Sequence, residues 1–439
     1  MADSRDTIIC VFACRWCSLL GAERAGRARL PLPPSLRVIP VPCAGSVSAD
    51  MVMQAFVNGA DGVAVLGCHL GGCRHNDANR DEHVRLEVLA DLLESVGIDR
   101  RRLLISWGTA HEAEQYAQTM RDFAKSLDAF LPMPAMKLTA TTYVPFPHAG
   151  DGGKGQSVSP EVKEKVLASL REGRAVLGLV RARGVVPGLF FTEEEVESMA
   201  SGVRYPLAKL AGRILKDRRE GSVQGNDHVA LREEALECRL PLSIVCTPCD
   251  ARGLKEQLAL HQFNEEELHL IVESCSEEQQ KACRCERPEW PGNGGAAPEK
   301  TSEGEADLAA VSTRWQEAFS RCVQCYWCRS VCPVCVCPSC ALDRSAVLPA
   351  GEQAVSPLGY HLTRAMHVAD VCVQCGACQA ACPQGLPLLE LHQAVARSLK
   401  KHGYASGEGA LSPMLGARRL GDAKGISAPE WKSTGGGNV

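Results

Sequence analysis

A duplicated cysteine motif near the carboxyl end constrains the fold more than any other feature of the chain. Each copy reads C-x-x-C-x-x-C-x-x-x-C-P, and the two copies comprise Cys322, Cys325, Cys328, Cys332 and Pro333, then Cys372, Cys375, Cys378, Cys382 and Pro383. In this spacing the first three thiolates hold one 4Fe–4S cluster, and the fourth usually ligates the cluster of the other copy. The motif therefore predicts two 4Fe–4S clusters, held by Cys322, Cys325, Cys328 and Cys382 and by Cys372, Cys375, Cys378 and Cys332.

Zinc and disulfide bonds are the alternative uses of these cysteines. Structural zinc needs only C-x-x-C pairs, which leaves the third cysteine of each triplet and both Cys-Pro ends unexplained. Disulfides fit less well, because the segment after Met1 lacks the apolar core of a secretory signal peptide.

No apolar run approaches the roughly 18 residues of a membrane span. We therefore expect a cytoplasmic protein in which paired cysteines serve metal or redox chemistry.

The length of 439 residues predicts two or three domains. We expect a first α/β domain at residues 1–130, a linker at 131–159, and a second α/β domain that accompanies the iron–sulfur region at 160–290. A flexible linker or loop at 291–310, a dicluster 4Fe–4S ferredoxin module at 311–402 and a disordered tail at 403–439 would follow. A net charge of −4 excludes a broadly basic nucleic-acid binder.

Short apolar strands alternate with helices through the first domain. We expect the strands at residues 7–13, 37–41, 62–66 and 103–107, with helices between them and a last helix at 110–127. This alternation predicts a four-stranded parallel sheet with right-handed crossovers. The predicted fold class is therefore α/β, with a second α/β region and a ferredoxin-like module after the first domain.

Five cysteines lie just past the carboxyl ends of three of these strands: Cys14, Cys17, Cys43, Cys68 and Cys73. Since the carboxyl ends of parallel strands share one edge of the sheet, we expect the five thiols to converge. Four of them suffice for a 2Fe–2S cluster, and the sequence leaves open which one is not a ligand. Inert buried thiols are the alternative. Cys10 lies inside its strand and is expected to be structural.

The first domain also resembles the delta subunit of methyl-viologen-reducing hydrogenase. The residues that carry the resemblance lie in order between positions 7 and 128: Phe12-Ala-Cys14-Arg-Trp16-Cys17, Ala25-Gly26, Cys43-Ala-Gly45, Gly59-Ala-Asp-Gly-Val63 and Gly67-Cys68-His69-x-Gly71-x-Cys73. The resemblance implies a 2Fe–2S carrier that passes electrons from a hydrogenase or formate dehydrogenase to the flavoprotein subunit of heterodisulfide reductase. Gly72 departs from the acidic residue that is frequent in the family.

The region from about 242 to 395 resembles the iron–sulfur beta subunits of formate dehydrogenases and coenzyme-reducing hydrogenases. The resemblance rests on Cys249-Asp-x-Arg252, Cys275, Cys283-x-Cys285 and the first cluster motif with its extension to Cys335. Some members bind FAD and reduce a deazaflavin. Because no glycine fingerprint secures a flavin site here, FAD stays an unsupported alternative. The glycine-rich segment 150–155 lacks the spacing of a phosphate-binding P-loop and is expected to belong to the linker.

Seven surplus cysteines of this region are candidate ligands for a third cluster. They are Cys249, Cys275, Cys283, Cys285, Cys335, Cys337 and Cys340. We put forward a third 4Fe–4S cluster as a hypothesis, with zinc or unligated buried thiols as the alternatives. Between the motifs, residues 361–367 are expected to form a helix with a solvated amphipathic face. The alternative is that this helix carries a cation that tunes a nearby cluster.

These features predict an iron–sulfur electron-transfer subunit, with no catalytic residues of its own. It would link a hydrogenase or formate dehydrogenase type of oxidoreductase to a heterodisulfide-reductase-like flavoprotein in anaerobic energy metabolism. The paired motifs of a nickel–iron site and the adjacent Cys-Cys pair of a heterodisulfide-cleaving subunit are absent from the sequence. The alternatives are a flavin-containing subunit that itself reduces a deazaflavin or nicotinamide coenzyme, and a zinc-binding scaffold.

Overall fold

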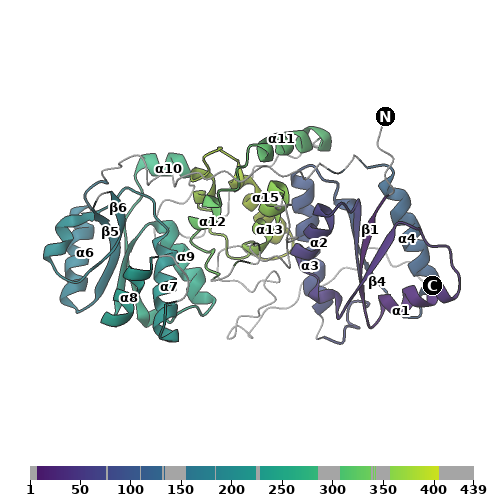
Figure 1. Ribbon diagram of the computed structural model, residues 1–439, viewed down its shortest axis with the longest axis horizontal. Helices are drawn as coiled ribbons and strands as arrows, with labels where there is room; N and C mark the ends of the chain where they lie inside the picture. The colour runs from purple at the N-terminus through teal and green to yellow at the C-terminus, as the bar shows by residue number, and fades with distance from the viewer. Residues whose placement is uncertain are drawn as a thin grey trace.

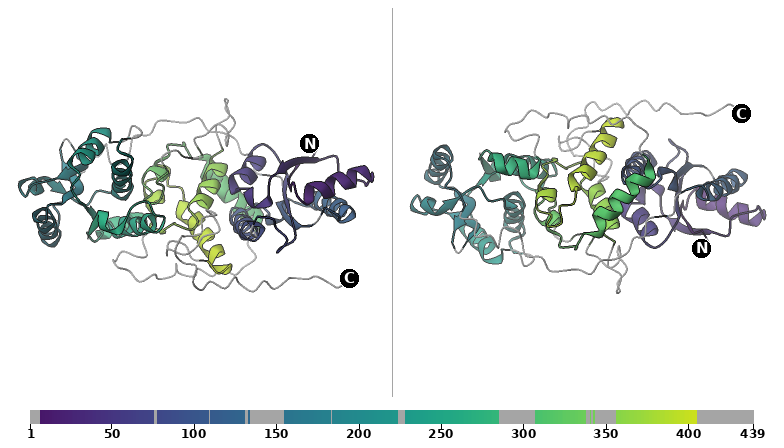
Figure 2. Two further views of the ribbon diagram at one scale, coloured as in Figure 1. Left: turned by 90° about the horizontal axis from the view of Figure 1, so that it is seen from below. Right: turned by 90° about the horizontal axis from the view of Figure 1, so that it is seen from above.

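The computed structural model describes residues 7–75, 78–108, 110–130, 133, 155–182, 184–223, 228–284, 307–337, 340, 342 and 356–404. Three parts lie side by side in all views (Figures 1 and 2). The C-terminal helical module lies between the N-terminal α/β domain and the second α/β domain. The order of the parts in space therefore differs from their order along the chain.

The N-terminal domain is a four-stranded parallel sheet with helices on both faces, as the sequence predicted. The strand order is β2-β1-β3-β4. The elements are β1 (Ile9–Cys14), α1 (Ser18–Arg27), β2 (Leu36–Val41), η1 (Ala44–Ser46), α2 (Ala49–Val57), β3 (Gly62–Gly67), α3 (Ala78–Ser95), η2 (Arg100–Arg102), β4 (Leu103–Trp107) and α4 (Ala113–Leu127). Helices α1 and α4 pack together on one face, and α2 and α3 cover the other (Figure 1).

Strand β1 illustrates why the sheet is buried on both faces. Ile9 and Val11 pack into the apolar cluster with residues of α1 and α4, whereas Cys10 and Phe12 pack into the cluster on the α2 and α3 side. This alternation follows from the two-residue period of a strand. A strand that is covered by helices on both sides is apolar at every position, which is why β1 reads as an unbroken apolar run.

The second domain contains a mixed sheet in the order β6-β5-β8-β9, with β7 paired to β5. Strands β5, β8 and β9 are parallel, and β6 is antiparallel to β5. The elements are α6 (Pro160–Arg171), β5 (Ala175–Arg181), β6 (Val185–Phe190), η3 (Glu194–Ser198), β7 (Met199–Ala200), α7 (Leu207–Glu220), α8 (Val229–Cys238), β8 (Leu242–Cys246), α9 (Pro248–Ala259), η4 (Glu265–Glu267), β9 (Leu268–Val272) and α10 (Glu277–Cys283).

The C-terminal module is helical, and its described residues contain no strand. Its helices are α11 (Leu308–Ser320), α12 (Trp327–Ser330), α13 (Pro357–His367), α14 (Ala377–Ala380) and α15 (Leu388–Lys401). The two cysteine motifs adopt the same backbone, with a loop that leads into a one-turn helix. Gln324 and Gln374 have φ values of 50° and 51°, and the residues before α12 and α14, Tyr326 and Gly376, have φ values of 61° and 71°.

The C-terminal module packs directly on α2 and α3 of the N-terminal domain. One apolar cluster contains residues of both parts, including Leu89 of α3 and Val395 of α15. The indole Nε1 of Trp315 donates to the carbonyl of Ser95 at 3.0 Å. Ser398 Oγ donates to Asp91 at 2.6 Å, and His367 pairs with Asp50. The two parts therefore share one core, although about 180 residues separate them along the chain.

Within the part of the chain that the structure describes, no helix combines the length and the apolar character that a membrane span requires.

Candidate metal centres

The first thiol group lies where β1 and β3 end. Cys14 is the last residue of β1, and Cys68 directly follows β3. The chain leaves these neighbouring strands toward opposite faces of the sheet, into α1 and α3, which makes this edge the topological switch point where α/β sheets bind ligands. The sulfurs of Cys14, Cys17 and Cys68 all lie within 4.8 Å of one another.

The other two N-terminal cysteines form a pair beside this group. Cys43 follows β2, and its sulfur lies 3.8 Å from the sulfur of Cys73. The sulfur of Cys73 accepts a hydrogen bond from the amide of His75 at 3.4 Å. The structure thus brings all five predicted thiols to one sheet edge, as a group of three and a pair. Cys10, by contrast, is buried within β1, and burial raises its pKa to about 11.

Hydrogen bonding prepares part of this thiol group for a metal. A hydrogen bond with Cys17 lowers the pKa of the Cys14 thiol, so Cys14 favours the thiolate, which is the form that binds metals. Two residues that were not predicted from the sequence, Ser18 and Asn79, bind the backbone where β3 ends. Ser18 Oγ donates to the carbonyl of Gly67 at 3.2 Å, and Asn79 Nδ2 donates to the carbonyl of Cys68 at 2.8 Å.

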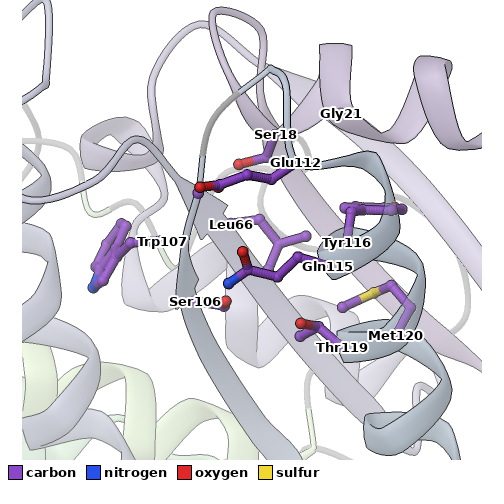
Figure 3. Close-up of a pocket in the computed structure, with 11 residues that line it drawn as sticks. Ser18, Gly21, Leu66, Ser106, Trp107, Glu112, Gln115, Tyr116, Thr119 and Met120 are labelled. Carbon is purple, nitrogen blue, oxygen red and sulfur yellow. The ribbon is translucent and has the colours of Figure 1, made fainter. Parts of the chain in front are cut away.

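A hollow of about 350 Å³ adjoins this site between α1 and α4 (Figure 3). Its lining is mixed polar and apolar and includes Ser18, Ser106, Glu112, Gln115 and Tyr116. Ser18 connects the hollow to the thiol group, because its Oγ lies 3.7 Å from the sulfur of Cys17. No thiol lines the hollow itself, so the metal-binding chemistry belongs to the adjoining sheet edge.

Each of the two hollows in the C-terminal module is lined by four cysteines. Both have a volume of about 330 Å³. The first is lined by Cys322, Cys325, Cys328 and Cys382, and the second by Cys332, Cys372, Cys375 and Cys378. In both cases the fourth cysteine comes from the other copy of the motif. Four thiols around one small hollow suit an iron–sulfur cluster, for which thiolates are the preferred ligands.

Helix α13 lies against both hollows, and the expectation that it has a solvated face is wrong. His361 and Arg364 are only 4% and 3% exposed, because α13 packs against α2, α11 and α15. His361 Nε2 lies 3.5 Å from the sulfur of Cys322. Arg364 donates to the carbonyl of Cys328 at 3.0 Å and to the sulfur of Cys335 at 3.8 Å. His361 and Arg364 therefore face cysteines instead of solvent.

The seven surplus cysteines lie in several different environments. Cys249 and Cys283 both contact the guanidinium of Arg204, a residue to which no sequence motif pointed. Cys335 lies beside Cys332 and Arg364. The others are the half-buried Cys275, the exposed Cys337, Cys340, which packs against the core shared with the N-terminal domain, and Cys285, which lies outside the described residues.

Comparison with known proteins identifies the first domain. Residues 9–130 match the family model of the methyl-viologen-reducing hydrogenase delta subunit. The iron–sulfur subunit of the vhc F420-non-reducing hydrogenase from Methanococcus voltae is 36% identical over 132 residues, which are 30% of this chain and 92% of that protein.

Two larger relatives match over a similar length of this chain. One is a component of the ferredoxin/F420H2-dependent CoB-CoM heterodisulfide reductase from Methanosarcina acetivorans, which is 34% identical over 130 residues, or 30% of this chain and 16% of that protein. The other is the F420-dependent formate dehydrogenase beta subunit from Methanocaldococcus jannaschii, which is 32% identical over 108 residues, or 24% of this chain and 28% of that protein. Through its N-terminal domain, the chain belongs to the family of methyl-viologen-reducing hydrogenase delta subunits.

Proposed function

We propose that this chain is an iron–sulfur electron-transfer subunit. It would link a hydrogenase or formate dehydrogenase type of oxidoreductase to a heterodisulfide-reductase-like flavoprotein in anaerobic energy metabolism. The observation that carries the proposal is the placement of the two four-cysteine hollows in a module that packs against the thiol-bearing N-terminal domain. The names of the relatives, which are subunits of hydrogenase, heterodisulfide reductase and formate dehydrogenase, support the proposed partners.

The distances suggest how five N-terminal thiols serve one 2Fe–2S cluster. Cys43 and Cys73, whose sulfurs are 3.8 Å apart, are suited to hold one iron. Two of Cys14, Cys17 and Cys68, which lie within 4.8 Å of one another, would hold the other iron. The spare thiol is then a member of the group of three.

The apolar clusters support a conduit that runs through the whole molecule. Cys14 and Cys322 belong to the apolar cluster that joins the N-terminal domain to the C-terminal module. Cys332 and Cys375 belong to another cluster, together with Cys249 of the second domain. Iron–sulfur clusters accept and release single electrons when they are bound. The protein's own contribution is to hold the thiolates, exclude water from them and set the charges around them.

Reduction of a flavoprotein tests the proposal. The full chain, purified anaerobically and reduced with dithionite, would be freed of excess reductant and mixed with the flavoprotein component of a heterodisulfide reductase. We expect the flavin absorbance to bleach with the wild-type chain and not with a Cys43→Ser, Cys328→Ser, Cys378→Ser variant, which lacks a ligand of each of the three clusters. Equal bleaching with both proteins, or none with the wild-type chain, would contradict the proposed function.

A further inference from the structure

A single arginine joins the second domain to the second four-cysteine hollow. Arg204 lies in the segment between β7 and α7 and is partly buried. Its Nη1 donates to the sulfur of Cys283 at 3.2 Å. Its Nη2 donates to the sulfur of Cys249 at 3.1 Å and lies 3.7 Å from the sulfur of Cys375. One guanidinium therefore contacts sulfurs from α10, from α9 and from the cysteine motif of the C-terminal module.

The backbone of the second domain fits closely against this part of the motif. A Cβ atom on Gly376 would lie 1.8 Å from the carbonyl oxygen of Cys283, at the end of α10. In the first copy of the motif the equivalent residue is Tyr326, which has a similar left-handed backbone. The second copy therefore has glycine where α10 lies directly on the loop. This contact brings Cys283, whose sulfur accepts from Arg204, next to the motif that contains Cys375.

A fixed cation beside a ligand sulfur stabilises the reduced form of an iron–sulfur cluster. Reduction adds one negative charge, and arginine stays protonated under all ordinary conditions. Hydrogen bonds to the sulfurs and the net charge around a cluster are among the factors that set its reduction potential. Arg364 and Lys209 add positive charge near the same cysteines, and Asp250 lies near Arg204. Only Arg204 among these cations comes within hydrogen-bonding reach of the sulfur of Cys375.

We propose that Arg204 is a positioning residue through which the second domain raises the reduction potential of the cluster held by Cys332, Cys372, Cys375 and Cys378. The proposal rests on the proposed function, because it needs a cluster at this site. Cys249 and Cys283 are then outer partners that orient the guanidinium and do not ligate iron. Thr247 contributes to this arrangement, since its Oγ1 lies 3.1 Å from the sulfur of Cys249.

The test is a potentiometric titration followed by EPR on the full-length chain, with Arg204→Gln, Arg204→Lys and wild type compared. Arg218→Gln is the matched control. Arg218 also contacts a cysteine sulfur, at 3.8 Å, but that cysteine is Cys238, which belongs to neither cysteine motif. The reduction step of the titration that is absent from Cys378→Ser is the step that belongs to the second cluster. We expect Arg204→Gln to shift that step to lower potential and Arg204→Lys to shift it less. The other 4Fe–4S step and the Arg218→Gln protein should stay unchanged.

An unshifted second step in Arg204→Gln with full iron content would overturn the proposal. Cys249→Ala and Cys283→Ala provide an independent check that does not change the charge of the arginine. Both should retain the iron content of the wild type, and loss of a whole cluster from either would make that cysteine a ligand and overturn the proposal. If the wild-type chain showed no 4Fe–4S signal, the proposed function would fail first, which distinguishes the two failures.

Discussion

The two copies of the cysteine motif have the same spacing and nearly the same backbone, yet they lie in different surroundings. The first copy faces aromatic residues and a histidine. His361 stacks on Phe319, with ring centroids 5.3 Å apart, and lies 3.5 Å from the sulfur of Cys322. Arg364 lies beside both copies, but only the second copy also faces the second domain, through Arg204 and Cys249. The local motif thus sets the arrangement of thiols, whereas packing against other parts of the chain sets their electrostatic environment.

One duplicated module can therefore give its two sites different properties. A neutral histidine and a fully charged arginine stabilise added negative charge to different extents. We therefore expect the two 4Fe–4S clusters to have distinct potentials, with the second set higher by Arg204.

Removing one ligand from each copy should separate the two sites completely. Cys328→Ser should abolish the first 4Fe–4S signal and Cys378→Ser the second, each with a loss of about four iron atoms per chain. Iron analysis and EPR of the full-length variants would measure this. If both variants lost both clusters, the two hollows would form one interdependent site and the comparison would fail.

Gly376 should be far less tolerant of a side chain than other glycines of the same conformation. A Cβ atom would lie 1.8 Å from the carbonyl oxygen of Cys283, so Gly376→Ala should lower the unfolding free energy by about 2–4 kcal/mol, the combined cost of a left-handed residue and overpacking. Gly385→Ala is the control, because Gly385 has φ of 60° and no atom within 4 Å of the added carbon. We expect it to cost about 1 kcal/mol. Equal costs in denaturant titrations would argue against close docking of α10.

His361→Phe should affect only the first cluster, and more weakly than Arg204→Gln affects the second. Phenylalanine retains the stacking on Phe319 but lacks the ring nitrogen near Cys322. Loss of a neutral partner should lower the potential of the first cluster slightly, because neutral hydrogen bonds are about half as strong as charge-assisted ones. The same redox titration measures this. If His361→Phe shifted the potential of the first cluster more than Arg204→Gln shifts that of the second, histidine would tune its cluster more strongly than arginine, contrary to this prediction.

Trp315→Phe should have the smallest effect, on stability alone. Trp315 is 2% exposed and donates to the carbonyl of Ser95 at 3.0 Å, across the contact between the N-terminal domain and the C-terminal module. Losing this hydrogen bond should cost about 1–2 kcal/mol of unfolding free energy, and both 4Fe–4S potentials should stay the same. A shift in either potential would mean that this interface also tunes the clusters.

The sequence predicted the features that depend on local pattern. Apolar runs such as 62–66 indicated the N-terminal strands, and strand ends predicted that Cys14 and Cys68 would meet. The short strand β7 and the edge strand β6, which contains Pro187 and Gly188, were missed because their propensities are weak and only pairing with β5 stabilises them.

Features that depend on packing between distant segments were not predictable from the sequence. The burial of α13 follows from its position between the N-terminal domain and α15, which no local pattern encodes. Arg204 stands in a segment with no motif, and only the fold brings it to Cys249, Cys283 and Cys375. The sequence does show glycine at position 376, where the first copy of the motif has Tyr326. The reason for the glycine is the close contact with the carbonyl of Cys283 at the end of α10, which only the structure shows.

The most direct test of the central claim is a metal and acid-labile sulfide analysis with EPR on the full-length, anaerobically purified and dithionite-reduced chain. The full chain is needed because the N-terminal domain and the C-terminal module share one core. We predict about ten iron atoms per chain, with one 2Fe–2S signal that is lost in Cys43→Ser and two 4Fe–4S signals that are retained in that variant. Zinc in place of iron, or an N-terminal domain without a 2Fe–2S signal, would contradict it.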